Sequence, residues 1–198
     1  MSFHTIFVFE FTALIALRLY WHWRANTRRD RETIRAGMAR EGAFKWVRLV
    51  LGIPGAVMLA LYLFRPSTLS GFELELPAAV RWTGAVLFLM ALLALGWVHH
   101  ALGRNFNTIL VLRTDHQLVT NGPYRWVRHP MYTAFIPLFI GMFLVTANVL
   151  FGVFACGMLG FLLIQRTPRE EAQLRERFGP EYDTYRARTG ALLPKLRV

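Results

Sequence analysis

Two polar stretches of this sequence hold residue types that could perform chemistry. The first runs from His116 to Tyr132 and reads HQLVTNGPYRWVRHPMY, and the second runs from Arg166 to Glu171 and reads RTPREE. His129 could be a general base, a ligand-binding donor, or the residue that caps a helix beginning at Pro130. Tyr124 and Tyr132 could be interfacial aromatics, or they could stack on a planar ligand such as a purine. The sequence contains no Gly-rich phosphate loop, no GxGxxG and no HExxH motif, so these rings and charges are the candidates.

Arg166 and Glu170 are four residues apart, so on one continuous helix they share a face. Each also has an ordinary structural explanation. Arg166 stands where any basic membrane anchor would, and Thr167, Pro168 and Glu170 fit a capping box with proline at the first helical position. Position alone leaves both explanations open.

The elements that must position these residues are apolar blocks typical of a membrane protein. The chain has 198 residues, of which 55% are hydrophobic. Its last apolar block, Met131 to Ile164, would form a helix about 50 Å long, against a hydrocarbon core of about 30 Å. We therefore expect a break at Thr146, Ala147 and Asn148. The prediction is an all-α polytopic membrane protein with five transmembrane helices, of which the first three span residues near 3–23, 44–64 and 78–98.

The net charge of +11 is distributed along the chain in a way that fits this arrangement of spans. Of the 23 basic residues, 20 lie in the segments 24–48, 99–130 and 166–198, which five spans place on one side of the membrane. The positive-inside rule makes that side cytoplasmic, so we expect the amino terminus outside and the carboxyl terminus inside. Because the charge is explained by membrane topology, we expect no nucleic-acid partner. The single cysteine, Cys156, permits no internal disulfide.

Some of the ionisable residues within or at the ends of the expected spans bear on function. Glu10, near the middle of the first span, is either functional or a protonated group bonded to a neighbouring helix. Arg18, near the end of that span, could snorkel to the interface. His99 and His100 point about 100° apart on a helix and have no further ligand at metal spacing, so we expect no metal site.

Four ordered segments of the chain resemble the isoprenylcysteine carboxyl methyltransferase family and its phospholipid methyltransferase relatives. They are LGRNF after His100, LVTNGPYRWVRHPMYT within the first polar stretch, REEAQL, and the closing FGPEYDTYRAR with Pro194. Together they cover residues 96 to 194, about half the chain. Three residues depart from the family pattern: Phe106, Asn107 and Ala134. These departures concern how closely the backbone packs and the shape of the acceptor that the site would take.

The resemblance implies S-adenosylmethionine as methyl donor, with no metal, in a pocket at the inner ends of the last spans. It divides the chain into an N-terminal part, 1–98, and a catalytic half, 99–198. That half comprises a cofactor loop (99–130), a helical hairpin (131–165) and a cytoplasmic helical segment (166–198) that closes the pocket. It also implies catalytic roles for Arg166, which would face the acceptor, and Glu170, which would hold the cofactor. The other cofactor-binding residues that it implies are His116, Gln117, Leu118, Val119, Tyr124, His129, Pro130, Met131 and Tyr132.

The resemblance leaves the methyl acceptor open, and a lipidic or hydrophobic acceptor within the membrane fits it. A carboxylate acceptor is already ionised and needs no general base, and Arg166 could orient it. An amine acceptor, as in phospholipid N-methylation, needs a base such as His129 or a glutamate. The rival from another class is a non-enzymatic transporter or lipid-binding sensor, which Glu10 would favour. Carboxylate O-methylation is the preferred interpretation.

Overall fold

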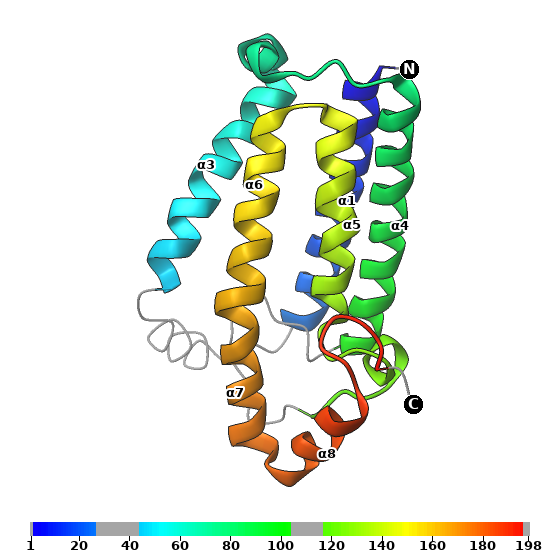
Figure 1. Ribbon diagram of the computed structural model, residues 1–198, viewed down its shortest axis with the longest axis vertical. Coiled ribbons are helices and arrows are strands. Elements are labelled where there is room, and N and C mark those ends of the chain that lie inside the picture. The colour runs from blue at the N-terminus through cyan, green and yellow to red at the C-terminus, as the bar shows by residue number, and fades with distance from the viewer. Residues whose placement is uncertain (1, 27–43, 104–116, 196–198) are drawn as a thin grey trace.

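The computed structural model describes residues 2–26, 44–103 and 117–195, where the regular structure is helical apart from two isolated β-bridges (Figure 1). The all-α prediction is therefore confirmed. A bundle contains α1 (Phe3–Asn26), α3 (Phe44–Phe64), α4 (Ala78–Leu102), α5 (Pro130–Thr146) and α6 (Val149–Gly160). Shorter elements are η1 (Pro66–Phe72), η3 (Gly122–Arg125), the π-helical turn η4 (Phe161–Arg166), α7 (Thr167–Phe178) and α8 (Pro180–Arg188).

Several of these helices are long and apolar enough to cross a membrane. Among the described residues there are three: Phe3–Ala25, Ala78–Leu102, and the continuous run Val149–Phe178. A fourth results if Leu49–Phe64 and Pro66–Phe72, which meet at 112°, are counted as one span. The remaining helix of the expected five, α5, is apolar but has only 17 residues. On length and composition, the described part of the chain thus holds three to four candidate spans.

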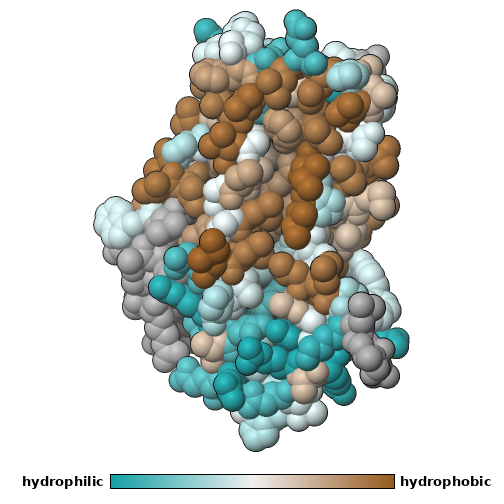
Figure 2. All heavy atoms as spheres, in the orientation of Figure 1, coloured by the Kyte–Doolittle hydropathy of each residue, from teal (hydrophilic) through white to brown (hydrophobic). Residues whose placement is uncertain are grey.

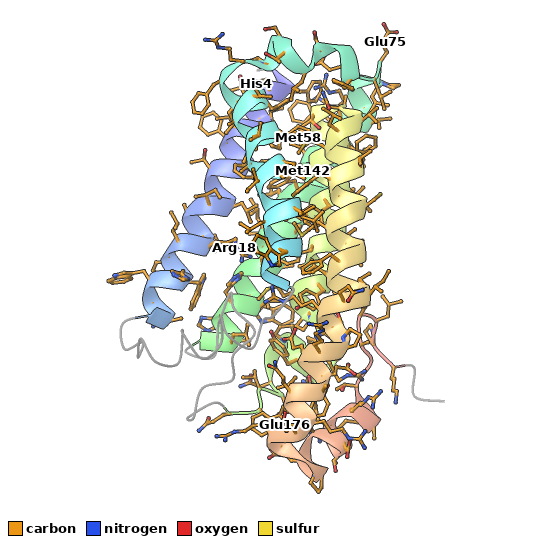
Figure 3. The ribbon with its side chains drawn as sticks, turned by 90° about the vertical axis from the view of Figure 1, so that its left-hand side faces the viewer. His4, Arg18, Met58, Glu75, Met142 and Glu176 are labelled. Carbon is orange, nitrogen blue, oxygen red and sulfur yellow. The ribbon has the colours of Figure 1, made fainter. Side chains whose placement is uncertain are left out.

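The surface supports a membrane environment. Figure 2 shows hydrophobic residues over the middle of the bundle and hydrophilic residues gathered at the end that carries α7 and α8. Figure 3 shows Glu176 at that end, and His4 and Glu75 at the opposite end. Exposed apolar side chains over such an area are expected where lipid takes the place of water.

Helices α4 and α5 touch through their backbones. A Cβ atom added at Gly84 would lie 2.8 Å from the backbone nitrogen of Val145, and one at Gly141 would lie 2.6 Å from the carbonyl oxygen of Gly84. Small residues permit this close approach in membrane bundles, where van der Waals packing holds helices together. The contact fixes the position of α5, which carries His129 and Tyr132 at its beginning.

An aromatic cluster joins the other helices. The ring of Phe7 in α1 packs edge-on against Tyr62 of α3, Phe151 of α6 and Phe88 of α4, with centroid distances of 5.0, 5.6 and 6.4 Å. Phe7, Phe88 and Phe151 are at most 1% exposed. Each such pair contributes about 0.5–1.5 kcal/mol beyond the burial of its area.

The break expected in the last apolar block is confirmed. Helix α5 ends at Thr146, Ala147 takes the left-handed conformation with φ of 50°, and Asn148 caps α6 by accepting a hydrogen bond from the backbone N–H of Leu150. The Asn148 side chain also donates to the carbonyl of Leu69 over 3.0 Å. The most polar point of the block thus makes the turn because its side chain satisfies the exposed backbone groups.

The chain then continues as one helix from Val149 to Phe178. The π turn η4 lies within it, and the residues at both of its ends, Gly160 and Thr167, have α-helical backbone angles. Gly179, with φ of 52°, ends this helix, and α8 then folds back toward the beginning of α5 (Figure 1). The first two turns of α7 therefore lie beside residues 126–129.

Candidate functional site

The candidate site lies where α5 begins and α7 passes beside it. Pro130 is the first residue of α5 and His129 precedes it, as the sequence predicts. His129 and Tyr132 are three residues apart, so their rings share a face and stack with centroids 5.4 Å apart and planes inclined by 9°. The Tyr132 hydroxyl donates to Oε2 of Glu170 over 2.6 Å. A hydrogen bond this short to an ionised carboxylate is among the stronger kinds.

Glu171 holds together three parts of the site. Its Oε1 accepts from Nε of Arg128 over 2.9 Å and lies 3.1 Å from Nε2 of His129, while its Oε2 lies 3.6 Å from Nε of Arg186. Since an ionised carboxylate only accepts, Nε2 of His129 carries the hydrogen in this contact. These partners, led by the bond to His129, hold the pKa of Glu171 at about 2, well below its ordinary value. Sequence reasoning missed this residue, and its position directly after Glu170 was the available signal.

Arg166 ends the π turn and lies four residues before Glu170 on the same continuous helix. Its guanidinium is close enough to the Tyr132 hydroxyl to act on it electrostatically. Arg166 is half-buried, as is Glu170, whose side chain is 36% exposed. The structure thus brings Tyr132, Arg166 and Glu170 together from segments about 40 residues apart.

The capping-box interpretation of Thr167, Pro168 and Glu170 is wrong. No separate helix begins at these residues. Arg166 already has α-helical backbone angles, and η4 continues directly into α7. No side-chain capping bond forms at this point, and the Thr167 hydroxyl instead donates to the carbonyl of Leu162 over 2.9 Å. Glu170 is therefore available for a role other than capping.

The carboxyl-terminal residues bind back onto the chain that leads into α5. The backbone N–H groups of Arg128 and His129 donate to the carbonyls of Gly190 and Ala191 over 2.8 and 3.0 Å, and Gly190 donates to Trp126 over 3.3 Å. We call residues 189–194 the carboxyl-terminal clasp. Its hold on residues 126–129 orders the backbone from which His129 projects.

Tyr124 lies in η3 and contacts α8. Its backbone carbonyl accepts from the Tyr185 hydroxyl over 2.7 Å. Burial, followed by the negative charge of Glu170, raises the pKa of the Tyr124 hydroxyl well above its ordinary value. The Tyr124 hydroxyl is thus close enough to Glu170 and Tyr132 to interact with them electrostatically.

The remaining residues of the predicted cofactor set lie at the beginning of α5, in the chain before η3, or beyond the described ranges. Pro130 is buried as the first residue of α5, and Met131 packs against the hydrophobic core. Gln117 is exposed, whereas Leu118 and Val119 are half-buried in chain without regular structure. His116 lies outside the described residues, as do Phe106 and Asn107. Ala134 is buried in α5.

The arrangement suits a small polar molecule that carries hydroxyl or ammonium groups. Glu170 offers a part-exposed carboxylate whose orientation Tyr132 fixes, and buried hydroxyls and rings lie around it. Arg166 adds a planar cation that can pair with a carboxylate in bidentate fashion. The site therefore holds a carboxylate and a guanidinium side by side, which can receive a cationic and an anionic ligand group together.

Part of the chain that holds this site is similar to known proteins. Residues 83–176 match the model of the isoprenylcysteine carboxyl methyltransferase (ICMT) family. A probable protein-S-isoprenylcysteine O-methyltransferase from Oryza sativa subsp. indica is 34% identical over 94 residues, 46% of this chain and 49% of the relative. The protein-S-isoprenylcysteine O-methyltransferases of Mus musculus and Saccharomyces cerevisiae are 34% and 35% identical over 97 residues, 48% of this chain, covering 34% and 41% of their own lengths. The chain thus matches about half or less of each relative's length.

Proposed function

We propose that this chain, which belongs to the isoprenylcysteine carboxyl methyltransferase family through residues 83–176, is an integral membrane methyltransferase that uses S-adenosylmethionine. The observation that carries the proposal is the hydrogen bond from Tyr132 to Glu170 with Arg166 beside it. All three residues fall within the matched segment, and the resemblance assigns the cofactor to two of them and the acceptor to the third.

The residues present fit the cofactor. Glu170 would accept hydrogen bonds from its hydroxyl or ammonium groups, and Tyr124, His129 and Tyr132 would form the aromatic wall beside it. When bound, the cofactor would supply an electrophilic methyl group on a positively charged sulfur, which would leave as a neutral thioether. Glu171 fixes the His129 ring, and the carboxyl-terminal clasp fixes its backbone, so this wall is set before any ligand arrives.

The acceptor is proposed to be a carboxylate on a lipidic molecule. A carboxylate is ionised at neutral pH, so its oxygen can attack without a general base, and Arg166 would orient it. An amine acceptor would need a base, and the structure gives that role less support. His129 is 4% exposed, and its Nε2 is engaged by Glu171.

We further propose that α5 completes a set of five spans with the amino terminus outside and the site on the cytoplasmic side. The support is the gathering of basic residues at the segments 24–48, 99–130 and 166–198, together with the apolar surface around the middle of the bundle (Figure 2). A lipidic acceptor can then approach from the bilayer, while a soluble cofactor approaches from the cytoplasm. A transporter would need polar groups along several spans, whereas the described polar contacts of the site gather at one end.

The test is calorimetric titration of the detergent-purified protein with S-adenosylhomocysteine, the demethylated product. We expect saturable binding that Glu170→Gln weakens at least tenfold, because the variant removes a charged acceptor. Glu176→Gln is the matched control, since it makes the same change at an exposed position of the same helix and should bind normally. Absence of binding in folded wild-type protein would contradict the proposal. Arg166→Ala should bind S-adenosylhomocysteine yet lose methyl transfer to a carboxylate acceptor.

A further inference from the structure

The π turn η4 interrupts the helix that carries the candidate site. The backbone N–H of Thr167 donates to the carbonyl of Leu162, five residues earlier, and the Thr167 hydroxyl donates to the same carbonyl over 2.9 Å. An α-helix instead joins residues four apart, so η4 holds one residue more than an α-helical turn. Single π turns inside α-helices occur frequently at functional sites.

The extra residue changes which side chains of α7 face the bundle. Before the turn, Phe151 and Ala155 of α6 face inward and are 1% and 6% exposed. On an uninterrupted α-helix, Arg169 would lie in line with Phe151, about five full turns later, and Glu170 would lie about 100° away from that line. In the structure, however, Arg169 is exposed, whereas Glu170 accepts from Tyr132 of α5. The π turn thus brings Glu170 to the face where Arg169 would otherwise lie.

The rest of α7 has the same rotation. Its partly buried residues include Glu170, Glu171 and Leu174, whereas Arg169, Ala172 and Glu176 are exposed. If η4 relaxed to α-helical bonding, every residue of α7 would move around the helix by about 100°. Arg169 would then face Tyr132 in place of Glu170. A guanidinium accepts no hydrogen bond, so it could not replace the carboxylate as the partner of the Tyr132 hydroxyl.

We propose that Thr167 is a positioning residue of the site. Its two bonds to the carbonyl of Leu162 hold η4 in the π register, and this register directs Glu170 toward Tyr132. The inference rests on the proposed function, because Glu170 is the residue proposed to hold the cofactor. In the α-helical register the site would present a cation to a cofactor that itself carries a positively charged sulfur. The register of this one turn therefore decides whether the site can bind the cofactor.

The first test removes the need for the π turn. A variant that lacks Ile164, which lies in η4 and is 71% exposed, can form an uninterrupted α-helix in which Glu170 keeps its place. We expect it to bind S-adenosylhomocysteine as the wild type does, and Glu170→Gln to weaken binding in it at least tenfold. Insertion of one alanine after Ile164 is the matched control. It adds a further residue to the turn, rotates α7 away from α5 and should abolish binding.

The second test removes the hydroxyl that holds the turn. Thr167→Val keeps the shape of the side chain, and we expect affinity for S-adenosylhomocysteine to fall about two- to tenfold, as for the loss of one neutral hydrogen bond. Thr167→Ser keeps the hydroxyl and should bind as wild type. Thr184→Val is the control, because it removes the same kind of bond, to the carbonyl of Pro180 in α8. In the protein that lacks Ile164, Thr167→Val should have no effect, because no π turn remains to be held.

A third measurement reports the register without any ligand. Cys156→Ala first removes the native thiol, and Arg169→Cys then places a thiol at the exposed position of α7. A water-soluble maleimide should label this thiol rapidly. Addition of Thr167→Val should slow the labelling, because the α-helical register turns position 169 toward α5, whereas addition of Thr184→Val should leave the rate unchanged.

The outcomes separate this inference from the proposed function. Equal affinity and equal labelling with and without Thr167→Val would overturn the role of Thr167, whether or not the variant lacking Ile164 folds. Loss of binding in that variant, when it is folded, would overturn the assignment of the register. A merely structural Thr167 would lower affinity equally with and without Ile164. Failure of the wild-type protein to bind S-adenosylhomocysteine would contradict the proposed function, while the labelling rates would still test the register.

Discussion

The hydroxyl of Tyr132 and the carboxylate of Glu170 lie 2.6 Å apart, although 38 residues separate them in the chain. The bond joins the first turn of α5 to the first turn of α7. Because α5 is fixed against α4 by backbone contact and α7 continues directly from α6, the bond connects two rigid elements. The geometry of the carboxylate is therefore set by the bundle.

Tyr132→Phe should test what this bond contributes. The variant keeps the ring and its stacking on His129 but removes the hydroxyl that orients Glu170. A hydrogen bond to a charged group is worth about 1.5–3 kcal/mol, so we expect affinity for S-adenosylhomocysteine to fall about 10- to 100-fold. Calorimetric titration measures this, with Tyr20→Phe at an exposed position as the control. Unchanged affinity would show that Glu170 needs no orientation by Tyr132.

Glu171 should make stability fall in acid. Its pKa is about 2 in the folded protein against 4.5 as the ordinary value, so the folded state favours the ionised form. The stabilisation is complete above pH 4.5 and is lost as the pH falls from there toward 2; its upper bound is about 3 kcal/mol. Thermal unfolding followed across this range should show the decline.

In Glu171→Gln the decline between pH 4.5 and 2 should be shallower, with lower stability at neutral pH. Glu176→Gln, an exposed position of the same helix, should keep the wild-type slope. Equal slopes in all three proteins would refute the assignment of this acid sensitivity to Glu171.

Gly190→Ala should release the carboxyl-terminal clasp. An added Cβ would lie 1.7 Å from the carbonyl oxygen of Leu193, a distance that no backbone adjustment of a few tenths of an ångström relieves. We expect faster amide hydrogen exchange at Arg128 and His129, whose N–H groups bond to the clasp, and weaker S-adenosylhomocysteine binding. Gly160→Ala is the control, because its Cβ would meet nothing within 4 Å in an α-helical backbone. Unaltered exchange would show that the clasp tolerates the methyl group.

Gly141→Ala should separate α4 from α5. Its Cβ would lie 2.6 Å from the carbonyl oxygen of Gly84 and 2.7 Å from the backbone nitrogen of Phe88, and backbone atoms cannot rotate away. Overpacking of this kind costs about 1–3 kcal/mol, so the unfolding temperature in detergent should fall by several degrees. Gly52→Ala, where the added Cβ meets nothing within 4 Å, should leave that temperature nearly unchanged. Similar shifts in both variants would argue against backbone contact as the cause.

The local features of the fold could be predicted from the sequence, because their causes lie within a few residues. Pro130 opens α5, and the polar residues 146–148 break the last apolar block. The same kind of reasoning failed at Thr167. The capping signature there lies in the interior of a helix, because the residues before Thr167 are already helical. There the continuity of the preceding span outweighed the local preference.

The partners of the site residues could not be predicted in the same way. Glu171 meets His129 across 42 residues of chain, and Gly190 meets Trp126 across 64, so no periodicity links them. The direction of Arg18 depends on the packing of α1 against α5, which composition does not determine. The resemblance supplied Tyr132, Glu170 and Arg166 as candidates. The structure added the hydrogen bond from Tyr132 to Glu170 and the contacts of Glu171 with Arg128 and His129.

Glu170 lies on the continuous helix from Val149 to Phe178, so it is connected without a break to the apolar part of that helix. A rigid helix that is longer than the hydrocarbon core tilts to match the thickness of the bilayer. Any change of tilt moves Glu170 and Arg166 together relative to Tyr132 on the shorter α5. We therefore expect the thickness of the bilayer to bear on the distance between Glu170 and Tyr132 in the candidate site.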